Sequence, residues 1–113
     1  MINTFNQVTI VGFVHDKATF NYFDNGSNVG TFVVKTHYIK RPESGAGYTT
    51  DFELTRCTVW NNVAPHMETI LIPGNKIFLT GKLRTTKYKD KKGHWVFATQ
   101  VIVDQLILEA SKV

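Results

Sequence analysis

The sequence predicts an all-β protein: one closed five-stranded Greek-key barrel with a single short helix between the third and fourth strands. Five segments are rich in β-branched and aromatic residues that alternate with polar ones, as in strands with one buried face. Turn-forming residues separate several of these segments, and one interruption has helical spacing instead. With 113 residues the chain can bury one hydrophobic core, so we expect a single domain over residues 1–113.

The expected strands follow one another along the chain. They run over Val8–Val14, Val29–Ile39, Phe52–Trp60, Lys76–Tyr88 and His94–Leu108. Turn-rich segments at residues 24–28, 41–47 and 89–93 connect parts of this array. We expect the last two of these segments to form the tips of long β-hairpins.

A short helix is expected after the third strand. Val63, Met67 and Ile70 are spaced as one face of a helix. One of the two asparagines at 61–62 is the expected N-cap, and the Pro–Gly pair at 73–74 ends the helix. The order of three strands, a helix and two strands is that of the OB-fold, a five-stranded Greek-key barrel.

Alternation along two strands separates a core face from an outward face. In the fourth strand the apolar parity contains Ile77, Leu79 and Leu83, which we assign to the core. The opposite parity carries cations and aromatic rings: Lys76, Phe78, Lys82, Arg84 and Tyr88. In the third strand the outward parity contains Leu54, Arg56 and Trp60, opposite to Glu53, Cys57 and Val59. Both outward faces therefore combine positive charge with aromatic rings.

The strongest local charge bias lies between residues 82 and 92, which hold six of the thirteen cations and one acid, Asp90. Tyr88 precedes the turn in this segment, and Trp95 and Phe97 follow it. Lys87 and Lys89 lie beside these rings in the sequence. A second finger is expected around residues 41–47, where Tyr38, Lys40, Arg41 and Tyr48 flank a glycine-rich turn.

Interleaved cations and aromatic residues are typical of single-strand nucleic-acid binding. The cations follow the phosphates, and each base offers a ring face for stacking, so binding tolerates any sequence. The alternative from the residues alone is that Trp60 and Phe78 belong to the core and that the lysines form an ordinary solvated face. The net charge of +4 favours an anionic partner in either case.

Several function classes lack their sequence signals. The four histidines lie in separate segments without metal-ligand spacing, and there is no nucleophile elbow or phosphate loop, so we expect no catalysis, cofactor or metal. Asp51 and Glu53 fit a solvated strand end better than a nuclease metal site. The lone Cys57 is expected to be a packed thiol in a reducing compartment. No segment is long enough to span a membrane or has the pattern of a signal peptide, so a cytoplasmic location is expected.

Four stretches resemble one known family, the bacterial-type single-stranded DNA-binding proteins. They are residues 6–14, 29–34, 73–77 and 81–88, and their order and spacing match the family over nearly the whole chain. The resemblance implies sequence-independent binding and protection of single-stranded DNA in replication, recombination and repair. It also implies a location in the bacterial cytoplasm with the nucleoid, the gene being chromosomal or carried by a phage or plasmid.

The resemblance also implies roles for individual residues. Trp60 and Tyr88 fall at positions where the family has stacking aromatic rings, whereas Leu54 falls where many members have tryptophan. Lys40 lies at or near another such tryptophan, two residues after Tyr38. Together with the charge pattern, the expected nucleic-acid contacts are Trp60, Tyr88, Arg56, Arg84, Lys82, Lys87, Lys89, Leu54, Tyr38, Lys40 and Trp95.

Assembly and partners are implied in the same way. Family members form homo-oligomers, usually tetramers, partly through the first strand and a histidine that aligns with Thr55; His15 stands where glycine is common, and a dimer is the alternative. Members also carry an acidic tail that recruits replication and repair proteins, which this chain, ending at Val113, does not contain. Either the protein naturally lacks the tail or the chain is truncated.

The alternative function is that of a tailless primosomal adaptor, which mainly binds partner proteins during replication restart and binds DNA weakly. A cold-shock-type RNA-binding protein is a third alternative. Its clustered aromatic motifs on adjacent strands are absent here.

Overall fold

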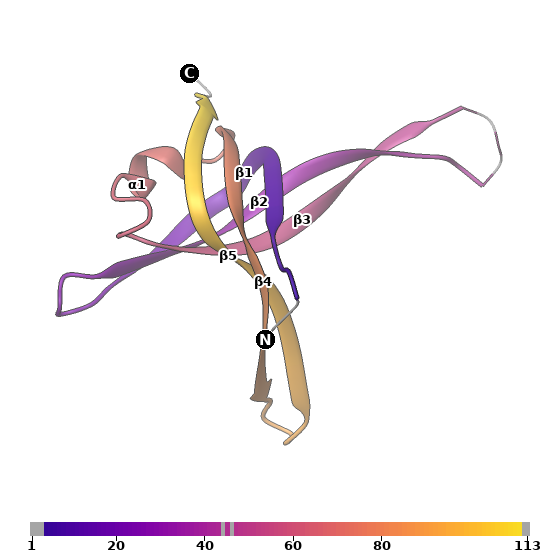
Figure 1. Ribbon diagram of the computed structural model, residues 1–113. Coiled ribbons are helices and arrows are strands. Elements are labelled where there is room, and N and C mark those ends of the chain that lie inside the picture. The colour runs from indigo at the N-terminus through magenta and orange to yellow at the C-terminus, as the bar shows by residue number, and fades with distance from the viewer. Residues whose placement is uncertain (1–3, 44, 46, 112–113) are drawn as a thin grey trace.

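The protein is a closed β-barrel in the computed structural model, which describes residues 4–43, 45 and 47–111. The elements in chain order are β1 (Val8–Tyr22), β2 (Asn28–Lys40), β3 (Thr49–Trp60), α1 (Met67–Ile70), β4 (Lys76–Lys89) and β5 (Trp95–Ala110). The strands close in the order β1-β2-β3-β5-β4, with β3 and β5 parallel and the other neighbours antiparallel. This topology confirms the predicted five-stranded barrel with its helix between β3 and β4 (Figure 1).

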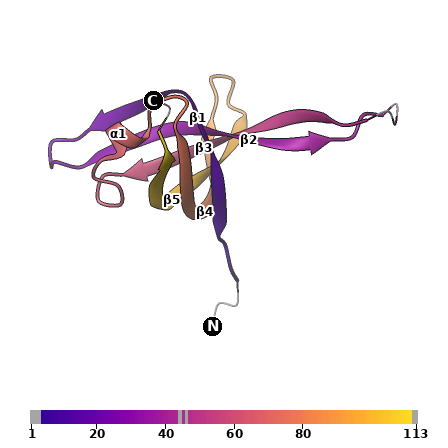
Figure 2. The same ribbon diagram turned by 90° about the horizontal axis from the view of Figure 1, so that it is seen from above.

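Three hairpin arms extend from the barrel, because paired strands continue beyond the core (Figures 1 and 2). The β2–β3 arm is paired as far as Lys40 and Thr49, and the β4–β5 arm as far as Lys89 and Trp95. These two arms confirm the predicted hairpin tips, although residues 44 and 46 lie outside the described part of the chain. The third arm, β1–β2, ends at the pair Tyr22 and Asn28.

The first strand is longer than its sequence indicates. The prediction ended it at Val14, but β1 continues to Tyr22 after a bulge between His15 and Thr19. Asp16 at this bulge has a φ of 63°, in the left-handed region. The sequence does not indicate this extension, because the bulge interrupts the alternation and the polar residues after Val14 are exposed.

The core lies inside the barrel and is closed at one end by α1. Its fully buried side chains are Met67, Ile77, Leu79, Val34, Val59, Val101 and Cys57. The predicted core parity is thus confirmed for Ile77 and Leu79. It is wrong for Leu83, which is 49% exposed because it lies at the edge of the barrel, where β4 continues into the exposed β4–β5 arm.

The helix is a single turn of four residues, shorter than predicted, and it is preceded by His66 and not capped by an asparagine side chain. Asn61 instead joins the end of β3 to the β1–β2 turn: its side-chain oxygen accepts a hydrogen bond from the Asn28 amide (3.1 Å), and its side-chain nitrogen donates to the Gly26 carbonyl (3.4 Å). Val63 is correspondingly exposed, whereas Met67 is fully buried. The end of β3 is therefore fixed to the tip of the β1–β2 arm.

Candidate nucleic-acid interface

Two arginines lie in one outward row across neighbouring strands. Arg84 of β4 is paired with Gln100 of β5. In the parallel contact of β3 with β5, Cys57 is paired with Val101, so the preceding residues, Arg56 and Gln100, are neighbours when this register is continued by one residue. Arg56 and Arg84 are thus two strand spacings apart, about 10 Å. Lys82, which is paired with Ile102, lies on the same outward face two residues before Arg84. The barrel surface therefore brings together three of the predicted phosphate contacts.

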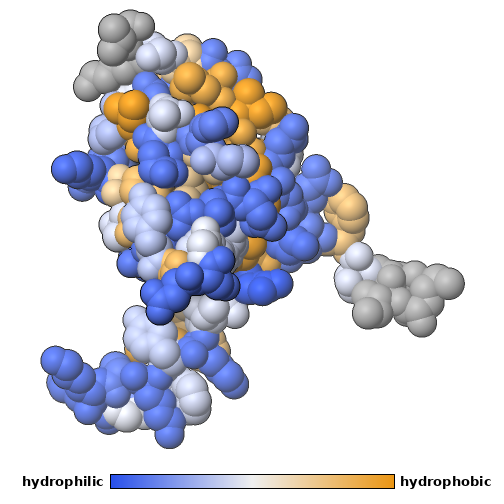
Figure 3. Space-filling model, turned by 90° about the vertical axis from the view of Figure 1, so that its left-hand side faces the viewer, coloured by the Kyte–Doolittle hydropathy of each residue, from blue (hydrophilic) through white to orange (hydrophobic). Residues whose placement is uncertain are grey.

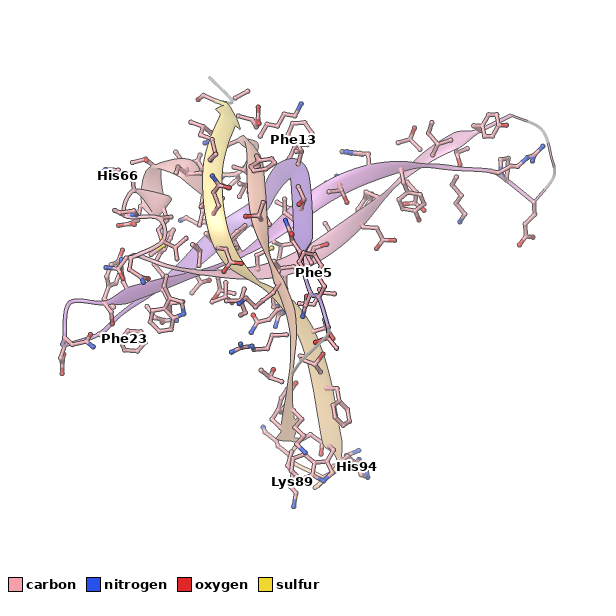
Figure 4. All side chains as sticks on the ribbon, viewed as in Figure 1. Phe5, Phe13, Phe23, His66, Lys89 and His94 are labelled. Atoms are coloured by element: carbon pink, nitrogen blue, oxygen red, sulfur yellow. The ribbon has the colours of Figure 1, made fainter. Side chains whose placement is uncertain are left out.

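Trp60 lies at the end of β3 with its side chain outside the barrel, 40% exposed. Its ring stacks against Phe23, with the ring centroids 5.9 Å apart and an interplanar angle of 26°. Phe23 lies in the turn of the β1–β2 arm and was not predicted to be part of the site (Figure 4). The sequence contains a signal, because Phe23 directly precedes the turn at residues 24–28, as Tyr88 directly precedes the turn at residues 89–93. The two rings form one aromatic platform.

The β4–β5 arm presents two different faces. On one face the Lys87 and Lys89 ammonium groups lie 5.2 Å and 5.1 Å from the centroid of the Trp95 ring. On the other face, set by the alternation of side chains, Tyr88 follows Arg84 along the strand. The predicted cationic contacts are therefore divided between two faces, since Lys87 and Lys89 lie on the opposite face of the arm from Lys82 and Arg84.

The tip of this arm keeps its positive charge. Its acid, Asp90, uses one carboxylate oxygen to accept hydrogen bonds from the backbone amides of Lys92 and His94, both at 2.9 Å. The other oxygen lies 3.7 Å from the Nδ1 atom of the His94 ring. Figures 3 and 4 show a hydrophilic arm with Lys89 and His94 at its far end. The lysines are therefore available to an anionic ligand.

The β2–β3 arm separates its predicted contacts in the same way. Leu54 is opposite Lys35 on the face that also carries Arg56 and Trp60, whereas Tyr38 and Lys40 point to the other face. Phe52, which was not predicted, lies on the Leu54 face with the Lys35 ammonium 4.4 Å from its ring centroid. The Leu54 face thus carries a cation and an aromatic ring in contact.

The surroundings of Tyr38 are less favourable for an anion. Partial loss of hydration, followed by the charges of Asp51 and Glu53, raises the pKa of the Tyr38 phenol above its ordinary value of 10.0. The phenol is therefore neutral at pH 7, and the two carboxylates repel phosphate from this part of the arm.

No grouping of His, Cys, Asp and Glu suited to a metal ion occurs among the described residues. Within the same part of the chain, no helix has the length and apolar character needed to cross a membrane.

Comparisons with known proteins agree with this geometry. The model of the Single-strand binding protein family matches residues 5–108. The "Single-stranded DNA-binding protein" of Bacteroides thetaiotaomicron is 30% identical over 115 residues, which cover 95% of this chain and 67% of that protein. The "Single-stranded DNA-binding protein 1" of Lactococcus lactis is 25% identical over 108 residues, covering 95% and 70%. The relative from Oceanobacillus iheyensis is 23% identical over 101 residues, covering 89% and 61%.

The chain spans about two thirds of the length of these curated relatives. Among solved structures, "Plasmodium falciparum SSB complex with ssDNA" superposes with a TM-score of 0.83 and 19% identity, covering 96% of this chain and 97% of that one. This similarity shows a shared fold. The fold, the family model and the bacterial relatives agree, and the chain belongs to the single-strand binding protein family.

Proposed function

We propose that the protein binds and protects single-stranded DNA with little regard to its sequence, in replication, recombination and repair. The observation that carries this proposal is the outward row of Arg56 and Arg84 beside the exposed platform of Trp60 and Phe23. Cations attract every phosphate equally and aromatic rings stack with every base, so the arrangement suits any sequence. The role is binding and not catalysis.

In the proposed path, phosphates follow Arg84, Lys82 and Arg56 across the barrel, and a base stacks on the free side of Trp60. Tyr88 extends this path along one face of the β4–β5 arm. Lys87, Lys89 and Trp95 form a separate contact on the opposite face, because the lysines already lie against the Trp95 ring. A strand that uses both contacts wraps around the arm, and Leu54, Tyr38 and Lys40 are proposed as outer contacts on the other arm.

A titration with oligo(dT) tests the function directly. Tryptophan fluorescence is followed at several salt concentrations, with double-stranded DNA and oligo(U) as controls. We expect strong quenching by oligo(dT), since Trp60 and Trp95 both belong to the proposed interface, and an affinity that falls steeply with salt. Weak, salt-insensitive quenching would instead favour an adaptor that mainly binds other proteins.

We also propose that the chain forms a homo-oligomer, a tetramer with a dimer as the alternative. An apolar row crosses the outer face where β1, β4 and β5 meet, formed by Val11, Phe78 and Ile107. Val11 and Ile107 are 47% and 44% exposed, and Phe13 at 40% lies on the same face of β1. Contiguous apolar side chains of this kind are typical of surfaces that another chain covers.

The proposed location is the bacterial cytoplasm, in association with the nucleoid, which the bacterial origin of the relatives supports. Replication and repair proteins are the proposed protein partners.

A further inference from the structure

We propose that a hollow beside the bulge of β1 binds one phosphate of the DNA strand, an inference that rests on the proposed function. The hollow has a volume of about 400 Å³. The residues that line it include His15, Lys17, Thr19, Thr31, Val33 and Arg56. Lys17 and His15 were not among the predicted contacts.

The bulge creates the hollow. His15 is paired with Val33 of β2, and Thr19 with Thr31, so β1 has more residues than β2 between these two pairs. The extra chain turns at Asp16, the one residue other than glycine with a positive φ in the described part of the chain (63°). Its side-chain oxygen accepts a hydrogen bond from the Lys17 amide at 2.8 Å, which stabilises the turn. Backbone strain of this kind often marks a functional site.

The charges around the hollow favour an anion. The Arg56 guanidinium and the Lys17 ammonium make no hydrogen bond or ion pair with any other described residue, although both line the same concave surface. Asp16 also lines the hollow and opposes an anion, but two permanent cations outnumber its single charge. The hydroxyl groups of Thr19 and Thr31 supply further donors. Charge-assisted hydrogen bonds from such a set are those that phosphate accepts best.

A phosphate fits this hollow better than a base does. Phe32 is the one aromatic residue that lines it besides the imidazole of His15, and its side chain is packed in the core and only 3% exposed. The hollow therefore offers no broad ring face such as Trp60 offers. Stacking and phosphate binding are thus divided between different parts of the barrel surface.

The hollow continues the proposed DNA path. Val33 lies between His15 and Arg56 across adjacent strands, and Arg56 is followed by Gln100 and Arg84. One outward row therefore crosses all five strands of the barrel. A phosphate in the hollow extends the contact from two strand spacings to four, roughly 19 Å along the surface.

The test compares Lys17→Ala with Lys76→Ala, since Lys76 is also an exposed lysine on the barrel but lies outside the row and the hollow. We expect Lys17→Ala to weaken oligo(dT) binding about tenfold, the effect of one charge-assisted hydrogen bond. The slope of log K against log salt should fall by about 0.7, as for one lost phosphate contact on a single strand. Lys76→Ala should change neither quantity, and Lys17→Arg should retain both.

A double-mutant cycle tests whether the two cations share one phosphate. The loss in Lys17→Ala/Arg56→Ala should be smaller than the sum of the single losses, whereas Lys17→Ala/Lys76→Ala should be additive. If the wild type binds oligo(dT) and Lys17→Ala behaves like Lys76→Ala, the phosphate subsite is wrong and the proposed function stands. If the wild type does not bind, the proposed function fails and the subsite fails with it. Thermal unfolding of each variant shows whether it is folded, and Lys17→Arg tests the charge independently.

Discussion

Trp60 is 40% exposed and has one ring face against Phe23, and we expect a base to stack on the other face. Trp60→Ala should therefore weaken binding to every DNA sequence by about 1–3 kcal/mol, the contribution of one stacked base. Phe23→Ala should have a smaller effect of the same sign, because Phe23 holds the Trp60 ring in place. The measurement is the affinity for oligo(dT) and for a mixed-sequence oligonucleotide. Tyr22→Ala, which removes an exposed ring on the same arm, is the matched control. Unchanged affinity in Trp60→Ala would remove this residue from the interface.

Cys57 is fully buried in the barrel, and burial raises the pKa of its thiol from 9.0 to about 12. The folded state therefore keeps the thiol neutral, while the unfolded chain ionises it above pH 9. This contribution is fully present below pH 9 and is lost as the pH rises towards 12, by at most about 1.4 kcal/mol for each pH unit. Chemical unfolding at pH 8 to 11 should show a steeper loss of stability in the wild type than in Cys57→Val. Equal slopes for the two proteins would show that the thiol ionises while folded.

At this scale, alternation identified the outward residues but not their neighbours across the fold. Arg56, Trp60 and Arg84 were assigned correctly to an outward face, because period-two alternation is a local property. Phe23 was missed because its contact with Trp60 depends on Asn61, which joins the end of β3 to a turn more than thirty residues earlier in the chain. The assignment of Leu83 to the core was wrong, because alternation shows which face a side chain takes and not where the barrel ends.

Changes in the β4–β5 arm should weaken DNA binding and leave the stability of the barrel almost unchanged. Every residue of β4 from Lys82 to Lys89 is exposed, and none contributes to the core. Replacing residues 87–97 by an Asn-Gly turn between the paired Thr86 and Ala98 should leave the unfolding temperature almost unchanged. The salt slope of oligo(dT) binding should fall by about 1.4, because the Lys87 and Lys89 contacts are lost.

A variant that keeps the whole arm but carries Lys87→Gln and Lys89→Gln distinguishes the contribution of the arm's charge to binding from that of its shape. If it reproduces the shortened arm, the arm acts through its charge; a further loss on shortening supports the wrapped path. A shortened protein with wild-type affinity and salt slope would exclude the arm from the interface.

Among the elements, the long strands were predictable and the irregular ones were not. Regular alternation located β2, β3, β4 and β5 with small errors at their ends. The second half of β1 was missed because a bulge interrupts the alternation and its arm is largely exposed. The helix was overextended because the spacing of Val63, Met67 and Ile70 suits a helix, whereas only Met67 and Ile70 belong to α1. Tertiary hydrogen bonds of Asn61 replace the expected cap.

The whole molecule combines a net charge of +4 with three arms that extend in different directions (Figure 1). A compact barrel alone would offer DNA a short contact, but arms that carry lysines and aromatic rings extend the surface well beyond the core. A flexible strand can follow such a surface, whereas a stiff duplex with a persistence length of about 50 nm must pay to bend around it. Selectivity for single strands is thus expected to come from shape, and salt dependence from charge.

The apolar row of Val11, Phe78 and Ile107 belongs to this same scale, because it lies on the barrel away from the β4–β5 arm. If a second copy covers it, Ile107→Glu should lower the mass measured by analytical ultracentrifugation below that of the wild-type oligomer. The substitution should cost the isolated chain little stability, since Ile107 is 44% exposed. Ile39→Glu, at a residue 74% exposed on the β2–β3 arm, is the matched control and should keep the wild-type mass. A wild type that sediments as a single chain would contradict the proposed oligomer.

Loss of oligomerisation should also weaken binding to long oligo(dT) more than to short oligo(dT), because only a strand that reaches a second barrel gains from the high effective concentration of its sites.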